Sequence, residues 1–302
     1  MRDIRRSLWA VLTLLYLSLA LQGQQLTLPL QKGSVRFAAI GDMGSGTTRQ
    51  YETAGRMNSL HEKFPFDFVV TLGDNIYGGN SSTDFKKKFE LPYKVLLEQG
   101  VKFYASLGNH DNAAVEKAYK PFNMNGDQYY TFKKGNVQFF ALDSNYMDPK
   151  EVAWLTKELQ NSGADWKICY FHHALYSSAA FHGSSSELQK ILEPLFVQHG
   201  VQVVLAGHDH VYERIKPQKG IYYFVAGSGG ELRKGDLRKT GLTEVGYDQD
   251  QVFLLMEISG DALNFQAVSR SGKTVDSGSI IRKAKTNGGL STQARGSQTN
   301  RP

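Results

Sequence analysis

The chain is poor in cysteine, and it has no long apolar run after its first 21 residues. Cys169 is the only cysteine among 302 residues, so an intramolecular disulfide cannot form. It lies in an apolar stretch typical of a buried strand, which favours an inert core thiol over a catalytic nucleophile. A domain of this size can bury enough surface to fold without disulfides, so their absence is compatible with export.

The central part of the chain also lacks a net charge. Of the formal charge of +6, residues 1–20 carry +2 and residues 283–302 carry +4, which leaves residues 21–282 neutral. No stripe of basic residues interleaved with aromatic residues occurs, although such a stripe is typical of nucleic-acid binding. We therefore expect no nucleic-acid partner.

The N-terminus has the pattern of a signal peptide. Three arginines within the first six residues precede an uncharged apolar stretch over residues 8–21, with small residues at positions 18 and 20. This stretch is shorter than the ~20 residues that span a bilayer, although a membrane anchor is the alternative. We predict a signal peptide over residues 1–20, with residue 23 as a later cleavage point. The protein would then be secreted, periplasmic or in a lysosome-like compartment, with no stable membrane insertion after cleavage.

Short apolar runs alternate with helical periodicity through the middle of the chain. Three segments favour helices by their spacing and capping residues: 47–61, 149–161 and 186–199. Strands are predicted at 35–40, 66–72, 101–107, 129–132, 137–142, 166–171, 201–206, 222–226, 252–258, 263–269 and 274–281. Residues 284–302 have a polar composition without periodicity, which predicts a disordered tail.

Five short polar motifs follow apolar strand runs in order along the chain. A single Gly-Asp turn or histidine is most simply an ordinary surface feature, but the carboxyl ends of neighbouring strands can bring five motifs to one point. Together they supply carboxylates, a phenol, an amide and imidazoles, a ligand set for two metal ions that share one carboxylate. Two adjacent metals favour displacement at phosphorus. The motifs are Gly41-Asp42-Met43-Gly44, Gly73-Asp74-Asn75-Ile76-Tyr77, Gly108-Asn109-His110-Asp111, Phe171-His172-His173 and Gly207-His208-Asp209-His210.

This motif set resembles the calcineurin-like metallophosphoesterase superfamily and, within it, the purple acid phosphatases of the small, tartrate-resistant type. The resemblance covers residues 35–282, and Cys169 and Ala174 depart from the Val and Pro usual around the fourth motif. It implies an α/β fold of mixed α+β type, a four-layer αββα sandwich of two mixed β-sheets flanked by helices. We expect one catalytic domain over residues 33–283.

The same resemblance implies a ligand map for one Fe(III) ion and one divalent ion, which can be Fe, Zn or Mn. Hard Fe(III) favours carboxylate and phenolate oxygens, whereas imidazole and amide groups suit the divalent ion. Asp74 is predicted to bridge the two ions, and His173 is the alternative to His172. The predicted ferric ligands are Asp42, Asp74, Tyr77 and His210, and the predicted divalent ligands are Asp74, Asn109, His172 and His208.

Two further histidines are predicted to be catalytic by resemblance. His110 is expected to bind the phosphoryl group or protonate the leaving group, and His182 is expected in the substrate pocket, with a solvated loop position as its alternative. Asp111 would orient His110 or cap a helix over residues 113–119.

The resemblance also implies the reaction. We expect a secreted acid phosphatase that hydrolyses small phosphate monoesters or phosphoproteins with a metal-activated hydroxide, and with an optimum below neutral pH. The main alternative is a phosphodiesterase or nucleotidase of the superfamily without the ferric–tyrosinate site. A non-catalytic binding protein of this fold would be expected to lose ligands, and all seven predicted positions keep a ligand residue.

Overall fold

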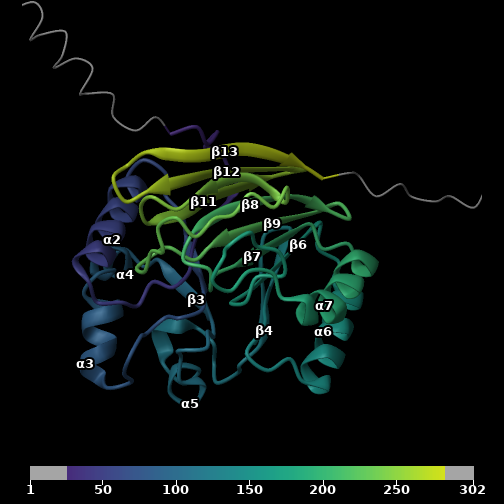
Figure 1. The fold of residues 1–302 in the computed structure, drawn as a ribbon, viewed down its shortest axis with the longest axis horizontal. Helices are drawn as coiled ribbons and strands as arrows, with labels where there is room; N and C mark the ends of the chain where they lie inside the picture. Colours follow the sequence, from purple (N-terminus) through teal and green to yellow (C-terminus); the bar gives the residue numbers. More distant parts are fainter. Residues whose placement is uncertain (1–25, 283–302) are drawn as a thin grey trace, which may run out of the picture.

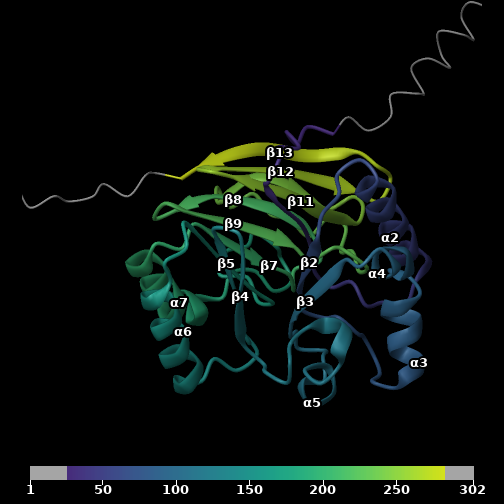
Figure 2. The ribbon, with the colours of Figure 1, turned by 180° about the vertical axis from the view of Figure 1, so that it is seen from behind.

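The computed structural model describes residues 26–282, which form two mixed β-sheets lying face to face between helices (Figure 1). The same arrangement is seen from behind in Figure 2, where the strands near the chain's end close one side of the molecule. The predicted fold class is therefore confirmed. The predicted signal peptide and the tail at 284–302 lie outside the described residues.

The first sheet has six strands and contains the three parallel strands whose ends carry the first three motifs. Its remaining strands join antiparallel on one side. In spatial order the strands are β13 (Thr274–Ile281), β12 (Ala262–Ser269), β11 (Val252–Ser259), β1 (Val35–Ile40), β2 (Phe68–Leu72) and β3 (Lys102–Ser106).

The second sheet has seven strands, four of which are parallel neighbours. Antiparallel partners complete both of its edges. In spatial order the strands are β10 (Thr243–Tyr247), β8 (Tyr212–Gln218), β9 (Ile221–Ala226), β7 (Val203–Ala206), β6 (Trp166–Phe171), β5 (Val137–Ala141) and β4 (Tyr130–Lys134).

Helices cover the outer faces of both sheets (Figure 1). Met57 belongs to the main hydrophobic core, which includes residues of both sheets, whereas Leu155 and Leu192 pack in a separate cluster on the outer face of the second sheet. The helical elements are α2 (Thr48–His61), α3 (Ser82–Phe85), the π-helix η1 (Lys86–Glu90), α4 (Lys94–Glu98), α5 (Ala113–Glu116), the 3₁₀-helix η2 (Lys120–Phe122), α6 (Pro149–Asn161) and α7 (Ser186–His199).

Aromatic side chains form the layer between the two sheets. Phe37 and Phe68 from the first sheet meet Phe139 from the second edge to face, with ring centroids 5.1 and 5.3 Å apart. All three side chains are fully buried. Offset and edge-on ring pairs add to the stabilisation that comes from burying their area, so this layer holds the two sheets in fixed register.

The three predicted helices occur nearly at the predicted positions, and their caps explain why. The side chains of Thr47, Asp148 and Ser185 each accept a backbone N–H three residues ahead, which satisfies an N–H group left unpaired at a helix start. The predicted helix at 113–119 is shorter, and Asn112 caps it instead of Asp111. The helical segment at 82–98 and strands β8 and β10 were not anticipated.

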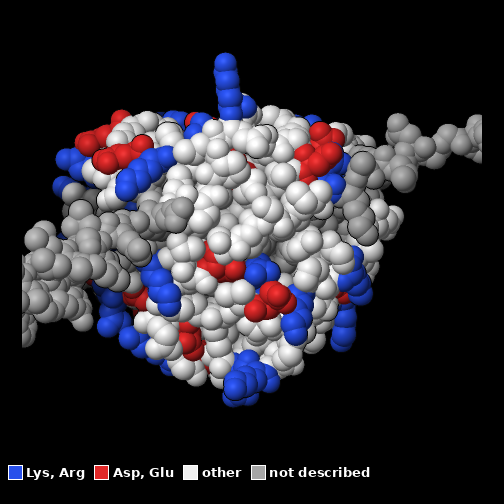
Figure 3. All heavy atoms as spheres, turned by 90° about the horizontal axis from the view of Figure 1, so that it is seen from above, with Lys and Arg blue, Asp and Glu red and all other residues white. Residues whose placement is uncertain are grey.

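Within residues 26–282, no helix is long and apolar enough to cross a membrane. On the face above β12 and β13, basic and acidic side chains are mixed, with uncharged surface between them (Figure 3). This face therefore shows no single-sign patch of the kind that binds a polyanion.

Glu151, in the first turn of α6, is a buried carboxyl that links the helix to the loop after β5. Its Oε1 accepts the Asp143 backbone N–H at 2.8 Å, and its side chain is only 1% exposed. Burial raises the pKa of Glu151 to about 8. Because the folded pKa lies above the unfolded value, ionisation removes stability as the pH rises from about 4.5 to 8.

Glu151→Gln is therefore expected to stabilise the protein at pH 9 by on the order of 2 kcal/mol and to change little at pH 4.5. Urea unfolding at the two pH values measures this difference. Glu187→Gln is the control, because Glu187 lies in the first turn of α7 but is exposed. A loss of stability in Glu151→Gln that is the same at both pH values would contradict the buried-charge explanation.

Candidate metal centre

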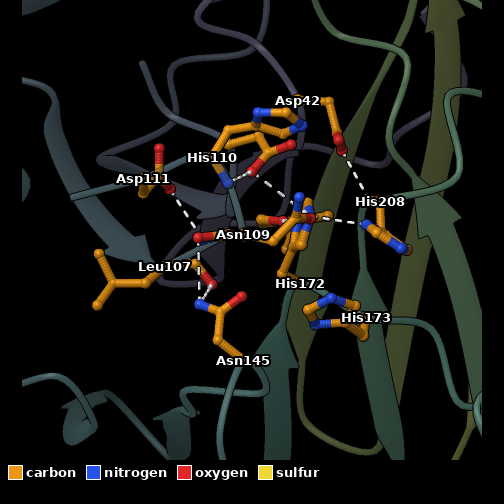
Figure 4. Close-up of polar contacts among 12 residues, drawn as sticks. Asp42, Leu107, Asn109, His110, Asp111, Asn145, His172, His173 and His208 are labelled. Atoms are coloured by element: carbon orange, nitrogen blue, oxygen red, sulfur yellow. Dashed lines mark hydrogen bonds and ion pairs between the residues drawn. The ribbon is translucent and has the colours of Figure 1, made fainter. Parts of the chain in front are cut away.

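The five motifs lie at the ends of five strands, and the structure brings their side chains together. Asp42, Asp74 and Asn109 follow β1, β2 and β3, while His172 and His208 follow β6 and β7. Figure 4 shows Asn109, His172 and His208 turned toward one another from both sheets. The site thus lies where the carboxyl ends of the parallel strands meet, as expected for an open α/β sheet.

The first group of donor atoms contains Asp42, Asp74 and His210, whose ligand atoms lie within 4.8 Å of one another. Tyr77 completes it, since its phenol oxygen lies 3.1 Å from Asp42 Oδ1 and 3.2 Å from His210 Nε2. His210 Nε2 is 3.3 Å from the same Asp42 oxygen. These four residues are the ones predicted to bind the ferric ion.

The second group is centred on His172. Its Nε2 lies 3.0 Å from Asn109 Oδ1, 3.0 Å from His208 Nδ1 and 3.5 Å from Asp74 Oδ1. Asp74 is therefore close to both groups, which is the placement that a bridging carboxylate requires. These four residues are the predicted divalent ligands.

The two adjacent histidines after β6 differ in how their rings are held. His172 Nδ1 lies 2.9 Å from the Leu72 carbonyl oxygen, which can only accept, so Nδ1 carries the proton and Nε2 presents a lone pair. His173 Nδ1 instead lies 2.9 Å from Ser144 Oγ. A ligand atom of His173 is still within 4.8 Å of those of His172 and His208, so His173 lies at the edge of the same group.

The protonation states of His172 and His208 are compatible with cations bound at the centre. Burial, followed by the neighbouring His173, holds the pKa of His172 well below its usual range. Burial and then His172 lower the pKa of His208 to about 2. Both rings are thus neutral, and the unprotonated His172 Nε2 faces His208 Nδ1 and the Asn109 amide oxygen at hydrogen-bonding distance. A cation among them satisfies all of these lone pairs at once.

The pKa values of the carboxylate and the phenol in the first group also favour a bound cation. Asp42 is fully buried, and burial raises its pKa to about 7. Burial, and then the charges of Asp42 and Asp74, hold the pKa of Tyr77 far above its usual range. A phenolate at this position therefore requires a strongly charged cation next to it, as Fe(III) would be.

Backbone strain accompanies the ligand positions. Asp42, Asp74 and His208 adopt φ values of 53°, 51° and 69°, in the left-handed region that non-glycine residues seldom occupy. Such conformations cost about 1–3 kcal/mol each and concentrate at functional sites. Glycine is needed beside them, because a Cβ on Gly108 would lie 2.1 Å from Asp74 Oδ1.

The two predicted catalytic histidines lie on the open side of the donor groups. His110 is exposed, its backbone N–H donates to Asp74 Oδ1 at 3.0 Å, and its ring centroid lies 5.0 Å from that of Tyr77. His182 is also exposed, but its ring centroid is only 3.8 Å from that of His208. The tertiary structure therefore brings His182 to the site from a separate loop.

Asp111 has neither of its two predicted roles. Its carboxylate accepts the backbone N–H groups of Gly108 and Ile76 and the Asn75 amide, so it ties the second and third motif loops together. Sequence reasoning also missed Asn145, whose amide donates to the Gly108 carbonyl at 3.1 Å. These supporting contacts join loops far apart in the chain, and no local pattern signals them.

Residues 35–212, which include all five motifs, match the family model described as calcineurin-like phosphoesterase. The match spans more than half of the chain, so the chain belongs to this metallophosphoesterase family. Among its relatives, tartrate-resistant acid phosphatase type 5 of Oryctolagus cuniculus is 26% identical over 326 residues, which cover 92% of this chain and 99% of the relative.

Two solved structures share the fold. GAP50, the anchor in the inner membrane complex of Plasmodium, superposes with a TM-score of 0.74 at 23% identity, over 84% of this chain and 91% of that one. Purple acid phosphatase PPD1 from yellow lupin (Lupinus luteus) seeds gives a TM-score of 0.69 at 19% identity, over 84% of this chain and 55% of that one. At these identities the similarity establishes the architecture alone.

Proposed function

We propose that the chain is a purple acid phosphatase, which hydrolyses phosphate monoesters with one Fe(III) ion and one divalent ion. The observation that carries this proposal is Tyr77, whose phenol oxygen lies within 3.2 Å of both Asp42 and His210. A phenol beside a buried carboxylate is a ligand for a hard, highly charged ion. The tartrate-resistant acid phosphatase that matches along almost the whole chain supports the same reading.

The divalent ion would bind to the second group, whose imidazole and amide donors suit Fe(II), Zn(II) or Mn(II). Bound metal ions supply Lewis acidity at phosphoryl oxygens and lower the pKa of a bound water. Asp74 holds the two groups at a fixed separation. His172 is oriented for this by its bond to the Leu72 carbonyl.

The two exposed histidines are proposed to contact the substrate. His110 is fixed through its backbone bond to Asp74, with its ring against Tyr77 at the open side, where an imidazole N–H donates a proton to the leaving oxygen. His182, whose ring centroid lies 3.8 Å from that of His208, is the second exposed imidazole placed to hydrogen-bond a substrate phosphate. The two rings thereby orient the ester over the metal centre.

The proposal extends to substrate and location. Substrates are small phosphate monoesters or phosphoproteins, because the exposed histidines leave the centre open on one side. Export rests on the signal-peptide pattern of residues 1–20 alone. Edman sequencing of the mature N-terminus tests this part, and retention of the initial methionine would refute it.

Tyr77→Phe tests the function most directly. The purified wild-type protein is expected to contain two metals per chain, one of them iron, and to be pink to purple from phenolate-to-Fe(III) charge transfer. The substitution removes the phenolate, so the visible band should disappear. Absorption spectra combined with metal analysis by mass spectrometry measure both properties.

Tyr146→Phe is the matched control, since Tyr146 is 81% exposed and should leave the band unchanged. A colourless wild-type enzyme that is fully active without iron would reject the purple acid phosphatase proposal. That result would favour the phosphodiesterase or nucleotidase alternative instead.

A further inference from the structure

A cationic side chain without an ionic partner lies beside the metal centre. The Arg233 backbone N–H donates to the His210 carbonyl at 3.0 Å, which places this residue next to a predicted ferric ligand. Its Nη1 is buried and has no hydrogen-bond partner. None of the ion pairs within residues 26–282 includes Arg233. A buried donor of this kind is costly unless a ligand satisfies it.

An exposed aromatic ring fixes the guanidinium in place. The Arg233 guanidinium carbon lies 3.6 Å from the centroid of the Phe181 ring, and Phe181 itself is 63% exposed. Stacking on a ring covers the face of a guanidinium and leaves its N–H edge available. The edge carries parallel donors that match the oxygens of a carboxylate or phosphate.

The two chain segments that carry this pair are held together by backbone hydrogen bonds. The Ala180 N–H donates to the Asp236 carbonyl at 2.8 Å, and the Arg238 N–H donates to the Ser178 carbonyl at 2.9 Å. The Gly183 N–H donates to Asp209 Oδ1 at 3.2 Å. The stacked pair therefore lies between two loop segments, residues 178–183 and 233–238, that these hydrogen bonds hold together.

These two loop segments lie on the side of the metal centre where we place the substrate. His182 follows Phe181 directly and lies against His208, so the stacked pair is adjacent to a group that we place on the substrate. After burial, the charge of Arg233 is the next cause that lowers the pKa of His182, which reflects their proximity. Nearby acids do not neutralise this charge through an ion pair in the described structure.

We propose that Arg233, held by Phe181, binds a second anionic group of the substrate, so the enzyme prefers phosphate monoesters that carry a carboxylate or another phosphate near the ester. This specificity rests on the proposed phosphatase function and deepens it. The two donor groups, once loaded with metal ions, would hold the reacting phosphoryl group, and the guanidinium would bind the anion on the remaining part of the molecule.

Binding of non-hydrolysable probes to the metal-loaded protein tests this proposal without turnover. The probes are ethylphosphonate, 3-phosphonopropionate and ethylene-1,2-diphosphonate, measured by calorimetry. We expect the wild type to bind the last two at least tenfold more tightly than ethylphosphonate, as a charge-assisted hydrogen bond provides. The carboxylate and diphosphonate probes distinguish the two kinds of second anion.

Arg233→Met is expected to abolish this preference, while Lys234→Met should retain it. Lys234→Met is the matched control, because Lys234 directly follows Arg233, is exposed, and its substitution removes the same charge. Phe181→Leu should reduce the preference by loosening the guanidinium. Metal content of each variant identifies damage to the centre itself.

Two results would overturn the proposal: no preference in the wild type, or equal losses in Arg233→Met and Lys234→Met. The proposed function is judged separately, by turnover of phenyl phosphate and by the tyrosinate band. A wild type that hydrolyses no monoester rejects that function, and the binding ratios still decide the role of Arg233.

Discussion

Asp74→Asn is expected to lose at least one metal ion per chain and to lower turnover by about 10³-fold or more. Asp74 lies in the first donor group and 3.5 Å from His172 Nε2 in the second, so it is placed to bind both ions. Asparagine keeps the shape and the Oδ1 that accepts the His110 N–H. It removes the charge on which metal binding depends, and such metals supply several kcal/mol to catalysis.

Metal analysis after gel filtration measures the loss directly, alongside activity. Asp209→Asn is the control, because Asp209 lies between two predicted ligands in the chain yet binds the Gly183 N–H instead of the donor groups. Its metal content should equal that of the wild type. If metal falls more in Asp209→Asn than in Asp74→Asn, the assignment of ligands is wrong.

His110→Ala is expected to lower kcat by about 10²–10⁴-fold for alkyl phosphates, whose leaving alcohol needs a proton. The loss should be much smaller for 4-nitrophenyl phosphate, whose leaving group is stable without one. The geometry behind this expectation is the exposed imidazole ring beside Tyr77, held by its backbone bond to Asp74. Steady-state kinetics on the two classes of ester measure the difference.

A second variant separates proton transfer from positioning. His110→Gln can still donate a hydrogen bond to a phosphoryl oxygen, but it cannot transfer a proton at this position. If proton transfer is the role, Gln and Ala are equally slow on alkyl phosphates. Recovery in the Gln variant, or equal losses on both ester classes, would assign His110 to phosphate positioning. The tyrosinate band is a check that the Tyr77 site is intact.

Much of the fold could be predicted because its signals are local. The apolar runs that form β1, β2 and β6 are almost fully buried. The start of α6 is signalled by two adjacent residues, the capping Asp148 and Pro149. Strand β8 was missed, because its Tyr-Glu-Arg-Ile-Lys-Pro-Gln sequence mixes charge and proline with few apolar residues. Its strand conformation depends on pairing with β9 and β10.

The predicted ligand set followed from the resemblance to the purple acid phosphatases, which the five motifs and their place after strands carry. His172 was preferred to His173 on that resemblance alone, because two adjacent histidines after one strand look alike in their spacing. The structure adds a contact that spacing cannot show: the Leu72 carbonyl, 100 residues earlier, holds the His172 ring in one tautomer. The resemblance alone predicted His182 in the substrate pocket, and only the structure shows its ring beside that of His208, since loop residues carry no periodic signal.

The sequence by itself determined most of the strands, the principal helices, the five motif loops and the chemical types of the donor atoms. These features depend on residues within one turn or one strand of each other. Only the tertiary structure decided how the donors meet, how Asp111 joins two loops and how Arg233 stacks on Phe181. Those contacts form only when the two sheets and the loops between them pack together. They join residues that are far apart in the chain, so local sequence patterns cannot predict them.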